Sequence, residues 1–189
     1  MRKLLREIKK CDICKEYLPN APRPILQASS ESRIVIIGQA PGQKVHGSGV
    51  PWEDKSGDEL RRWLGVEKEQ FYDAKLFALI PMGFCYPGKG RSGDLPPRPE
   101  CAPTWHQKLF AEMKNVRLTF LIGRYAQNYY LKDKCKTNLT ETVRAFNEFL
   151  PAFFPLVHPS PRNRIWQRKN TWFESDVVSC IQQKMGLLL

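Results

Sequence analysis

The sequence has no long hydrophobic run. None of its apolar stretches approaches the roughly 20 residues that a membrane-spanning helix needs. The opening segment, MRKLLREIKK, is charged throughout, where a secretory signal would carry an apolar segment. We therefore expect a cytoplasmic protein with no membrane partner.

Acidic residues are also in short supply. The chain has 30 Lys and Arg against 19 Asp and Glu, a formal charge of +11. Such an excess attracts a polyanion, either nucleic acid or an anionic membrane surface.

The sequence contains no repeats and no low-complexity segments. Its 189 residues, 42% of them hydrophobic, suit one domain with a real core, so we expect a monomer with a single domain over residues 1–189.

Four continuous apolar runs bounded by Gly or Pro have the form of buried parallel strands. They cover residues 33–38, 75–80, 117–123 and 153–157. Apolar residues recur at helical spacing over 56–65, 102–113, 124–131 and 140–150, with Gly65 as a helix stop. This alternation predicts an α/β fold, a three-layer sandwich with a central four-stranded, mainly parallel sheet flanked by helices.

Ligands of open parallel sheets bind beyond the carboxyl ends of the strands. The loops that follow the first, second and fourth predicted strands are rich in Gly or Pro and carry polar or cysteine side chains. We therefore expect these three loops to converge on one site.

The first of these loops begins with GQAPG and reaches Trp52. Its glycines allow tight turns and let a ligand approach the backbone closely. Trp52 offers a flat face on which a base can stack, or else it packs in the core. Asp58 is predicted to lie in the first turn of a helix, whereas Asp54 precedes that helix and is free to face the site.

The last loop, HPSPRN, begins with His158, which is either a group of the site or a capping or core histidine. Ser160 and the backbone after it can grip a phosphate, and Arg162 adds positive charge. Asn163 either contributes an amide to the site or is a turn residue.

The spacing of the cysteines predicts a metal centre. Cys11 and Cys14 form a C-x-x-C, and Cys85 and Cys101 flank a loop of Gly and Pro in which we expect no regular structure. Disulfides are rare in a reducing compartment, whereas four thiolates from two sites can hold a structural zinc or an iron-sulfur cluster. The alternative is four separate free cysteines.

These motifs together resemble the uracil-DNA glycosylase superfamily over nearly the whole chain. The cysteine arrangement is similar to that of its iron-sulfur branches, in which four cysteines bind a 4Fe-4S cluster. HPSPRN is similar to the motif of the single-strand-selective branch. HGSG and DKSGD resemble the iron-sulfur glycosylases of broader base specificity, in which the aspartate that matches Asp54 is catalytic.

The resemblance implies a monofunctional DNA glycosylase that hydrolyses the N-glycosidic bond of uracil or another deaminated base in DNA, as in base excision repair. It implies a 4Fe-4S cluster as cofactor, with zinc as the alternative. The ligands it implies are Cys11, Cys14, Cys85 and Cys101.

The chemistry assigns roles to three expected catalytic residues. Hydrolysis builds positive charge on the sugar and negative charge on the departing base. His158 would donate a hydrogen bond to the base and stabilise its charge. Gln39 stands where the uracil-specific iron-sulfur branch has a glutamate, and an amide cannot act as a base, so we expect Asp54 to position the water.

Two further sets of residues are expected around the site. Pro81 and Met82 lie where a uracil-reading asparagine is expected, which leaves the choice of base open. The residues expected to contact the base are Trp52, Gln39, Asn163 and Met82. Those expected to bind DNA are Ser160, Arg162, Arg164, Lys89 and Arg91.

Two other classes of function are compatible with parts of the pattern. A glycosylase-like module that binds nucleic acid without cleaving it would suit Gln39 in place of an acid, but would leave His158 and Asp54 without a use. A generic nucleotide-binding α/β protein is disfavoured because the chain has no GKS or GKT phosphate loop.

Overall fold

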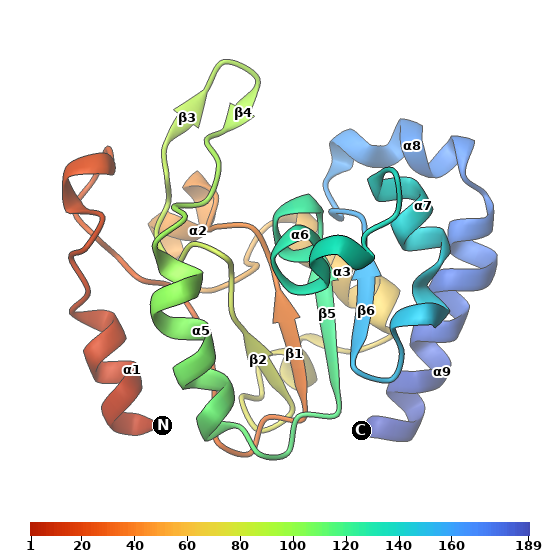
Figure 1. The fold of residues 1–189 in the computed structure, drawn as a ribbon, viewed down its shortest axis with the longest axis horizontal. Helices are drawn as coiled ribbons and strands as arrows, with labels where there is room; N and C mark the ends of the chain where they lie inside the picture. The colour runs from red at the N-terminus through yellow and green to blue at the C-terminus, as the bar shows by residue number, and fades with distance from the viewer.

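The four predicted strands form one sheet in the computed structural model, which describes residues 1–189. They are β1 (Ile34–Ile37), β2 (Phe77–Leu79), β5 (Leu118–Ile122) and β6 (Phe153–Leu156). Their order is β2-β1-β5-β6, and each neighbouring pair is parallel (Figure 1). The predicted four-stranded parallel sheet is therefore confirmed.

The other elements connect these strands or cover the sheet. None of the helices combines the length and the hydropathy needed to cross a membrane. In chain order these other elements are α1 (Arg2–Lys9), η1 (Lys15–Tyr17), α2 (Gln43–Ser48), α3 (Lys55–Leu64), α4 (Lys68–Phe71), β3 (Lys89–Gly90), β4 (Gly93–Asp94), α5 (Cys101–Glu112), α6 (Arg124–Leu131), η2 (Lys132–Lys134), α7 (Leu139–Arg144), η3 (Phe146–Phe149), η4 (Pro161–Asn163), α8 (Arg164–Lys169), the π-helical η5 (Phe173–Val178) and α9 (Ser179–Leu188).

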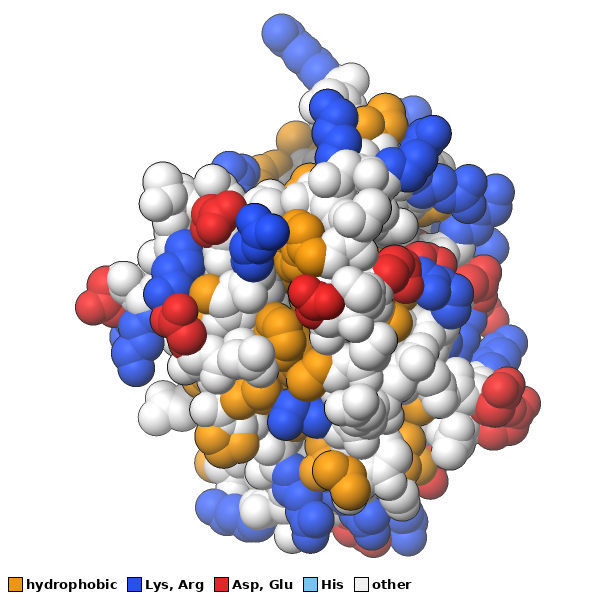
Figure 2. All heavy atoms as spheres, turned by 90° about the vertical axis from the view of Figure 1, so that its right-hand side faces the viewer, with side chains coloured by type: hydrophobic (Ala, Val, Ile, Leu, Met, Phe, Trp, Pro, Cys, Tyr) orange, Lys and Arg blue, Asp and Glu red, His pale blue; other side chains and the backbone are white.

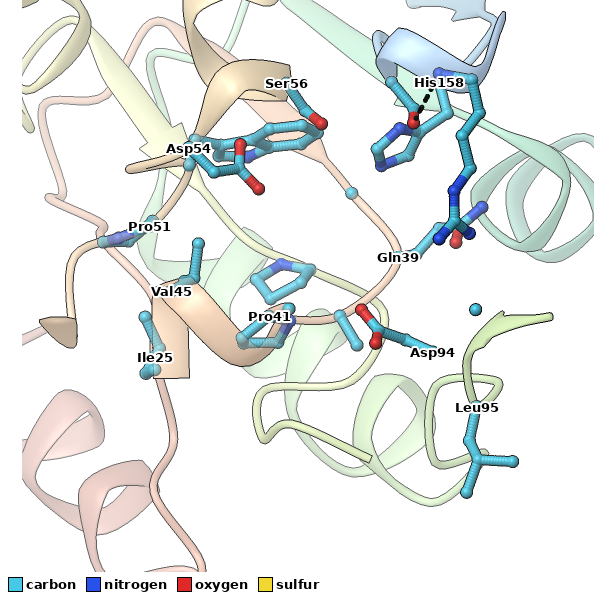
Figure 3. Close-up of a pocket in the computed structure, with 18 of the residues that line it drawn as sticks. Ile25, Gln39, Pro41, Val45, Pro51, Asp54, Ser56, Asp94, Leu95 and His158 are labelled. Atoms are coloured by element: carbon cyan, nitrogen blue, oxygen red, sulfur yellow. Dashed lines mark hydrogen bonds between the residues drawn. The ribbon is translucent and has the colours of Figure 1, made fainter. Parts of the chain in front are cut away.

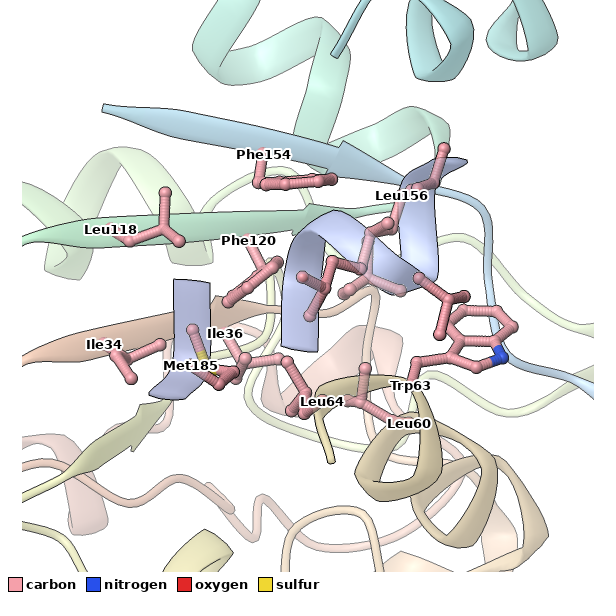
Figure 4. Packing of buried hydrophobic residues seen from close by; sticks show 14 of the residues in the cluster. Ile34, Ile36, Leu60, Trp63, Leu64, Leu118, Phe120, Phe154, Leu156 and Met185 are labelled. Atoms are coloured by element: carbon pink, nitrogen blue, oxygen red, sulfur yellow. The ribbon is translucent and has the colours of Figure 1, made fainter. Parts of the chain in front are cut away.

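Alternate strand residues pack into two separate cores, because successive side chains of a strand point to opposite faces of the sheet. Ile34 and Ile36 join a cluster with residues of α3, α7, η5 and α9 (Figure 4). Val35 and Ile37 join a second cluster with residues of α1, α5 and α6. Helices thus cover both faces of the sheet, which makes the predicted three layers.

The helix predicted over 140–150 is broken in two. α7 ends at Arg144, and the short 3-10 helix η3 follows. Phe146 packs in the core with α9 and stacks on Phe154, whereas Phe149 packs in the opposite core. Residues three apart share one face of an α-helix, so a continuous helix would not place these two rings in different cores.

A small hairpin replaces the irregular loop expected between Cys85 and Cys101. β3 and β4 pair antiparallel through Lys89 with Asp94 and Gly90 with Gly93, so that expectation was wrong for these residues. Gly93 has a φ of 150°, which is accessible to glycine, and it closes a two-residue turn. The segment has G-x-G-x-x-G spacing but forms a hairpin, not the strand-to-helix turn of dinucleotide-binding proteins. It projects beyond the carboxyl ends of the strands (Figure 1).

Candidate active site

A cavity of about 510 Å³ opens at the carboxyl ends of the strands (Figure 3). Apart from Ile25, which precedes β1, its lining comes from the three connections that follow β1, β2 and β6. Those after β1 and β6 include GQAPG and HPSPRN, and the one after β2 contains the hairpin. Seven of the expected catalytic, base-binding and DNA-binding residues line it, namely Gln39, Trp52, Asp54, His158, Ser160, Arg162 and Asn163.

Trp52 forms one wall of the cavity and is held in place by its neighbours. A Cβ on Gly38 would lie 2.7 Å from the indole, and one on Gly57 would lie 1.7 Å from the Trp52 carbonyl oxygen. Both positions therefore require glycine. The Tyr72 hydroxyl donates to the Pro51 carbonyl at 2.9 Å and fixes the same turn. Trp52 is half-buried: it packs at the edge of the core and also lines the cavity.

Asp54 is the N-cap of α3 and lines the same cavity. Its Oδ1 accepts a hydrogen bond from the Gly57 N–H at 2.9 Å, which satisfies one of the free amides at the start of the helix. Its Oδ2 has no hydrogen-bond partner in the protein. One carboxylate oxygen thus fixes the side chain, and the other remains free for a ligand.

His158 faces Trp52 across the site. The two ring centroids are 5.7 Å apart and the planes are inclined by 31°. Burial lowers the pKa of His158 below its ordinary value of 6.5, although the charge of Asp54 acts in the opposite direction. The imidazole is therefore neutral at pH 7 and offers one N–H donor. The Asn163 side-chain amide donates to the His158 carbonyl at 2.7 Å, so Asn163 orders this turn as well as lining the cavity.

The loop after β2 is paired to GQAPG through its backbone. Met82 N–H donates to Gly38 O and Gly83 N–H donates to Gln39 O, both at 2.9 Å. Met82 itself is 7% exposed and packs in the core beneath α5, and it does not line the cavity. Pro81, the preceding residue, lines the cavity instead.

His106 supports this loop from behind and carried no signal in the sequence, where it lies inside a predicted helix. Its Nε2 lies 3.0 Å from the Pro81 carbonyl oxygen and its Nδ1 lies 2.6 Å from the Tyr130 hydroxyl. Burial lowers the pKa of His106 to about 4. The neutral ring can therefore donate to Pro81 and accept from Tyr130, which fixes the backbone at the cavity wall.

The basic residues expected to bind DNA divide into two groups. Arg162 and Ser160 line the cavity, and Arg162 Nη1 donates to the Ser92 carbonyl at 3.1 Å, which ties the hairpin to HPSPRN. Lys89, Arg91 and Arg164 lie outside the cavity on the hairpin and at the start of α8, and their side chains are exposed. Figure 2 shows Lys and Arg side chains at the upper end of the molecule, the end from which the hairpin projects, and others at the lower end.

The four cysteines of the predicted metal centre line one small gap between the amino-terminal segment, the start of the hairpin loop and α5. Burial raises the pKa of Cys85 to about 11 and that of Cys101 to about 12, and the neighbouring cysteines act in the same direction. No three His, Cys, Asp or Glu side chains are already arranged as ligands of a metal ion. Cys135 and Cys180 lie elsewhere.

The fold and the three site loops agree with a known family. The model of the uracil DNA glycosylase superfamily matches residues 26–181, and the chain belongs to this superfamily. The match begins after Cys11 and Cys14 and so does not bear on that pair.

Among individual proteins, the chain is similar to the Type-4 uracil-DNA glycosylase of Thermotoga maritima. The two are 24% identical over 160 residues, which cover 81% of this chain and 78% of the relative.

Proposed function

We propose that the protein is a DNA glycosylase that hydrolyses the N-glycosidic bond of uracil or another deaminated base in DNA, as the first step of base excision repair. The observation that supports this most is the meeting of Trp52, Asp54 and His158, from two separate loops, around one cavity. An aromatic wall, a fixed carboxylate and a neutral imidazole donor are the groups that the reaction requires.

The proposed reaction begins with a nucleotide turned out of the stack into the cavity, at a cost of a few kcal/mol. The base stacks on Trp52, which offsets part of this cost. The bond between the anomeric carbon and the base nitrogen breaks, and both electrons leave with the base. His158 donates to the base and stabilises its negative charge, which develops mainly in the transition state.

Water completes the reaction. The free Oδ2 of Asp54 accepts a hydrogen bond from this water and directs its oxygen to the anomeric carbon. As the new carbon–oxygen bond forms, the proton of the water passes to Asp54. No lysine lines the cavity, so no amine is placed to form a Schiff base with the sugar. This supports a monofunctional glycosylase that leaves the DNA backbone intact.

Oligonucleotides that carry uracil, hypoxanthine or xanthine, single- and double-stranded, test this function. The expected product is an abasic site that is cleaved by alkali, formed on at least one of these substrates. Tight binding of the same oligonucleotides without any abasic product would instead establish a non-cleaving module, for which the neutral Gln39 would be the reason.

The proposed DNA surface runs over the hairpin and α8 on either side of the cavity and includes Arg168 of α8. Each neutralised phosphate releases counterions, so the logarithm of the affinity should fall by roughly 0.9 per log unit of salt for each contact with a duplex. Arg164→Gln should reduce this slope by about 0.9, measured by fluorescence anisotropy over a salt series.

Lys114→Gln is the matched control, because Lys114 is also exposed but lies between α5 and β5, at the amino ends of the strands and away from the cavity. An affinity that does not change with salt, or an equal loss of slope in both variants, would contradict this surface.

We also propose that Cys11, Cys14, Cys85 and Cys101 hold a 4Fe-4S cluster, with zinc as the alternative. The residues fit such a group, because four thiols from three segments surround one gap and the rest of its lining is mainly apolar. When bound, the group would cross-link these segments. The gap lies apart from the cavity, and the two share no lining residue, so its role is structural.

The protein as purified should be brown, with broad absorption near about 400 nm from thiolate-ligated iron. Cys85→Ser should lose the metal and unfold at a lower temperature, because the hairpin loop loses its anchor. Cys180→Ser, which removes a thiol from α9, should change neither property. Metal analysis that finds neither iron nor zinc, or a Cys85→Ser variant as stable as the parent, would refute the centre.

A further inference from the structure

Asp94 brings a second carboxylate to the cavity. It is the last residue of β4, and its side chain points into the cavity on the side opposite Asp54 (Figure 3). Its carboxylate lies against the GQAPG loop: a Cβ built on Gly42 would be 3.3 Å from Asp94 Oδ2. Asp54 and Asp94 are the only acidic residues that line the cavity.

The hairpin holds Asp94 in this position. The backbone of Asp94 pairs with Lys89, and the next amide, Leu95 N–H, donates to Gly88 O at 2.8 Å. The bond from Arg162 Nη1 to Ser92 O anchors the turn of the hairpin to HPSPRN. These three contacts, at Asp94 itself and at the residues before and after it, fix the backbone that carries the carboxylate.

No ion pair or side-chain hydrogen bond engages this carboxylate. Asp94 is exposed, accepts no hydrogen bond through its side chain and takes part in no ion pair, although Lys89 pairs with it through the backbone. The charge of Asp94 therefore makes no contact that would stabilise the fold.

The charge of Asp94 is also unfavourable for binding DNA. It lies at the mouth of the cavity, among residues of the proposed DNA surface, and a carboxylate there repels phosphates. Asp94 attracts a part of the substrate only when positive charge develops on the sugar. Gln39, on the same side of the cavity, is neutral and does not supply this charge.

We propose that Asp94 is a further catalytic carboxylate, whose negative charge stabilises the positively charged sugar while the bond to the base breaks. This inference rests on the proposed glycosylase function. Both electrons of the broken bond leave with the base, toward His158, and the positive charge left on the sugar lies between Asp54 and Asp94. Asp54 takes the proton of the water, and Asp94 remains ionised throughout.

Asp94→Asn tests this role because it removes the charge and keeps the shape. Single-turnover cleavage should slow by about 10-fold, since a preorganised charge acts on the transition state. Affinity for the same oligonucleotide should rise by about 2-fold or more at low salt, since a repulsive charge has been removed. Asp94→Glu, which restores the charge, should recover most of the rate.

Asp133→Asn is the matched control, because Asp133 is an exposed carboxylate in η2 that does not line the cavity. It should change neither rate nor affinity. Cleavage by Asp94→Asn at the rate of the parent, with or without tighter binding, would overturn the catalytic role. So would an Asp94→Glu variant as slow as Asp94→Asn. A parent protein that cleaves none of the oligonucleotides would instead overturn the proposed function itself.

Discussion

Replacing His158 with alanine should slow release of the base by about 100- to 1,000-fold, the effect of removing one preorganised hydrogen-bond donor from an active site. His158 lies two residues after the end of β6, and its imidazole is neutral because burial lowers its pKa. Its ring nitrogens have no hydrogen-bond partner in the protein, so the N–H is available to the base. The loss falls mainly on the transition state, because the negative charge on the base is absent from the bound substrate and develops as the bond breaks.

The measurement is single-turnover cleavage of the preferred oligonucleotide, with affinity measured separately. The rate should fall while the dissociation constant changes little. His158→Gln, which retains an N–H donor, should keep part of the rate. An alanine variant within threefold of the parent would remove His158 from the chemistry.

Asp54→Asn should slow cleavage by about 100-fold without loss of stability. Asparagine is as good an N-cap as aspartate, and Asn138 already caps α7 here by accepting from the Glu141 N–H at 2.9 Å. The substitution therefore keeps the start of α3 and removes only the charge that would direct the water and stabilise the sugar.

Asp54→Ala separates the two roles of this residue. It removes both the cap and the charge, so it should cleave as slowly as Asp54→Asn and also lose about 1 kcal/mol of unfolding free energy. Urea unfolding of the two variants measures the cap, and cleavage measures the charge. An Asp54→Asn variant as fast as the parent would leave Asp54 as a cap alone.

The sheet was predictable because its strands are buried on both faces and therefore read as continuous apolar runs. The carboxyl-terminal elements η5 and α9 were not among the predicted helices, although Phe173, Val177, Ile181 and Met185 recur every four residues. The hairpin was not predictable: two strands of two residues each bury almost nothing, and their glycines indicate only a turn.

The candidate site was predictable where it depends on the ends of strands. The carboxyl edge of a parallel sheet brings the loops of Trp52 and His158 together, whatever their separation in the sequence. Pro81 and Met82 show the limit of this reasoning, because adjacent residues there face opposite directions, one into the cavity and one into the core. Asp94 lies 15 residues beyond β2, and only the hairpin places it at the cavity.

The loop between Cys85 and Cys101 would link the proposed metal centre to the mouth of the cavity, because it would restrict the conformations open to the chain between them. Cross-linking the ends of a loop of about 15 residues removes roughly 3 kcal/mol of conformational freedom from the open chain. With both ends bound to one group, the turn at Ser92 would have fewer arrangements left, and the hydrogen bond from Arg162 Nη1 to Ser92 O would select among them at little further entropic cost. A group buried away from the reaction would in this way restrict how far the rim of the cavity can move.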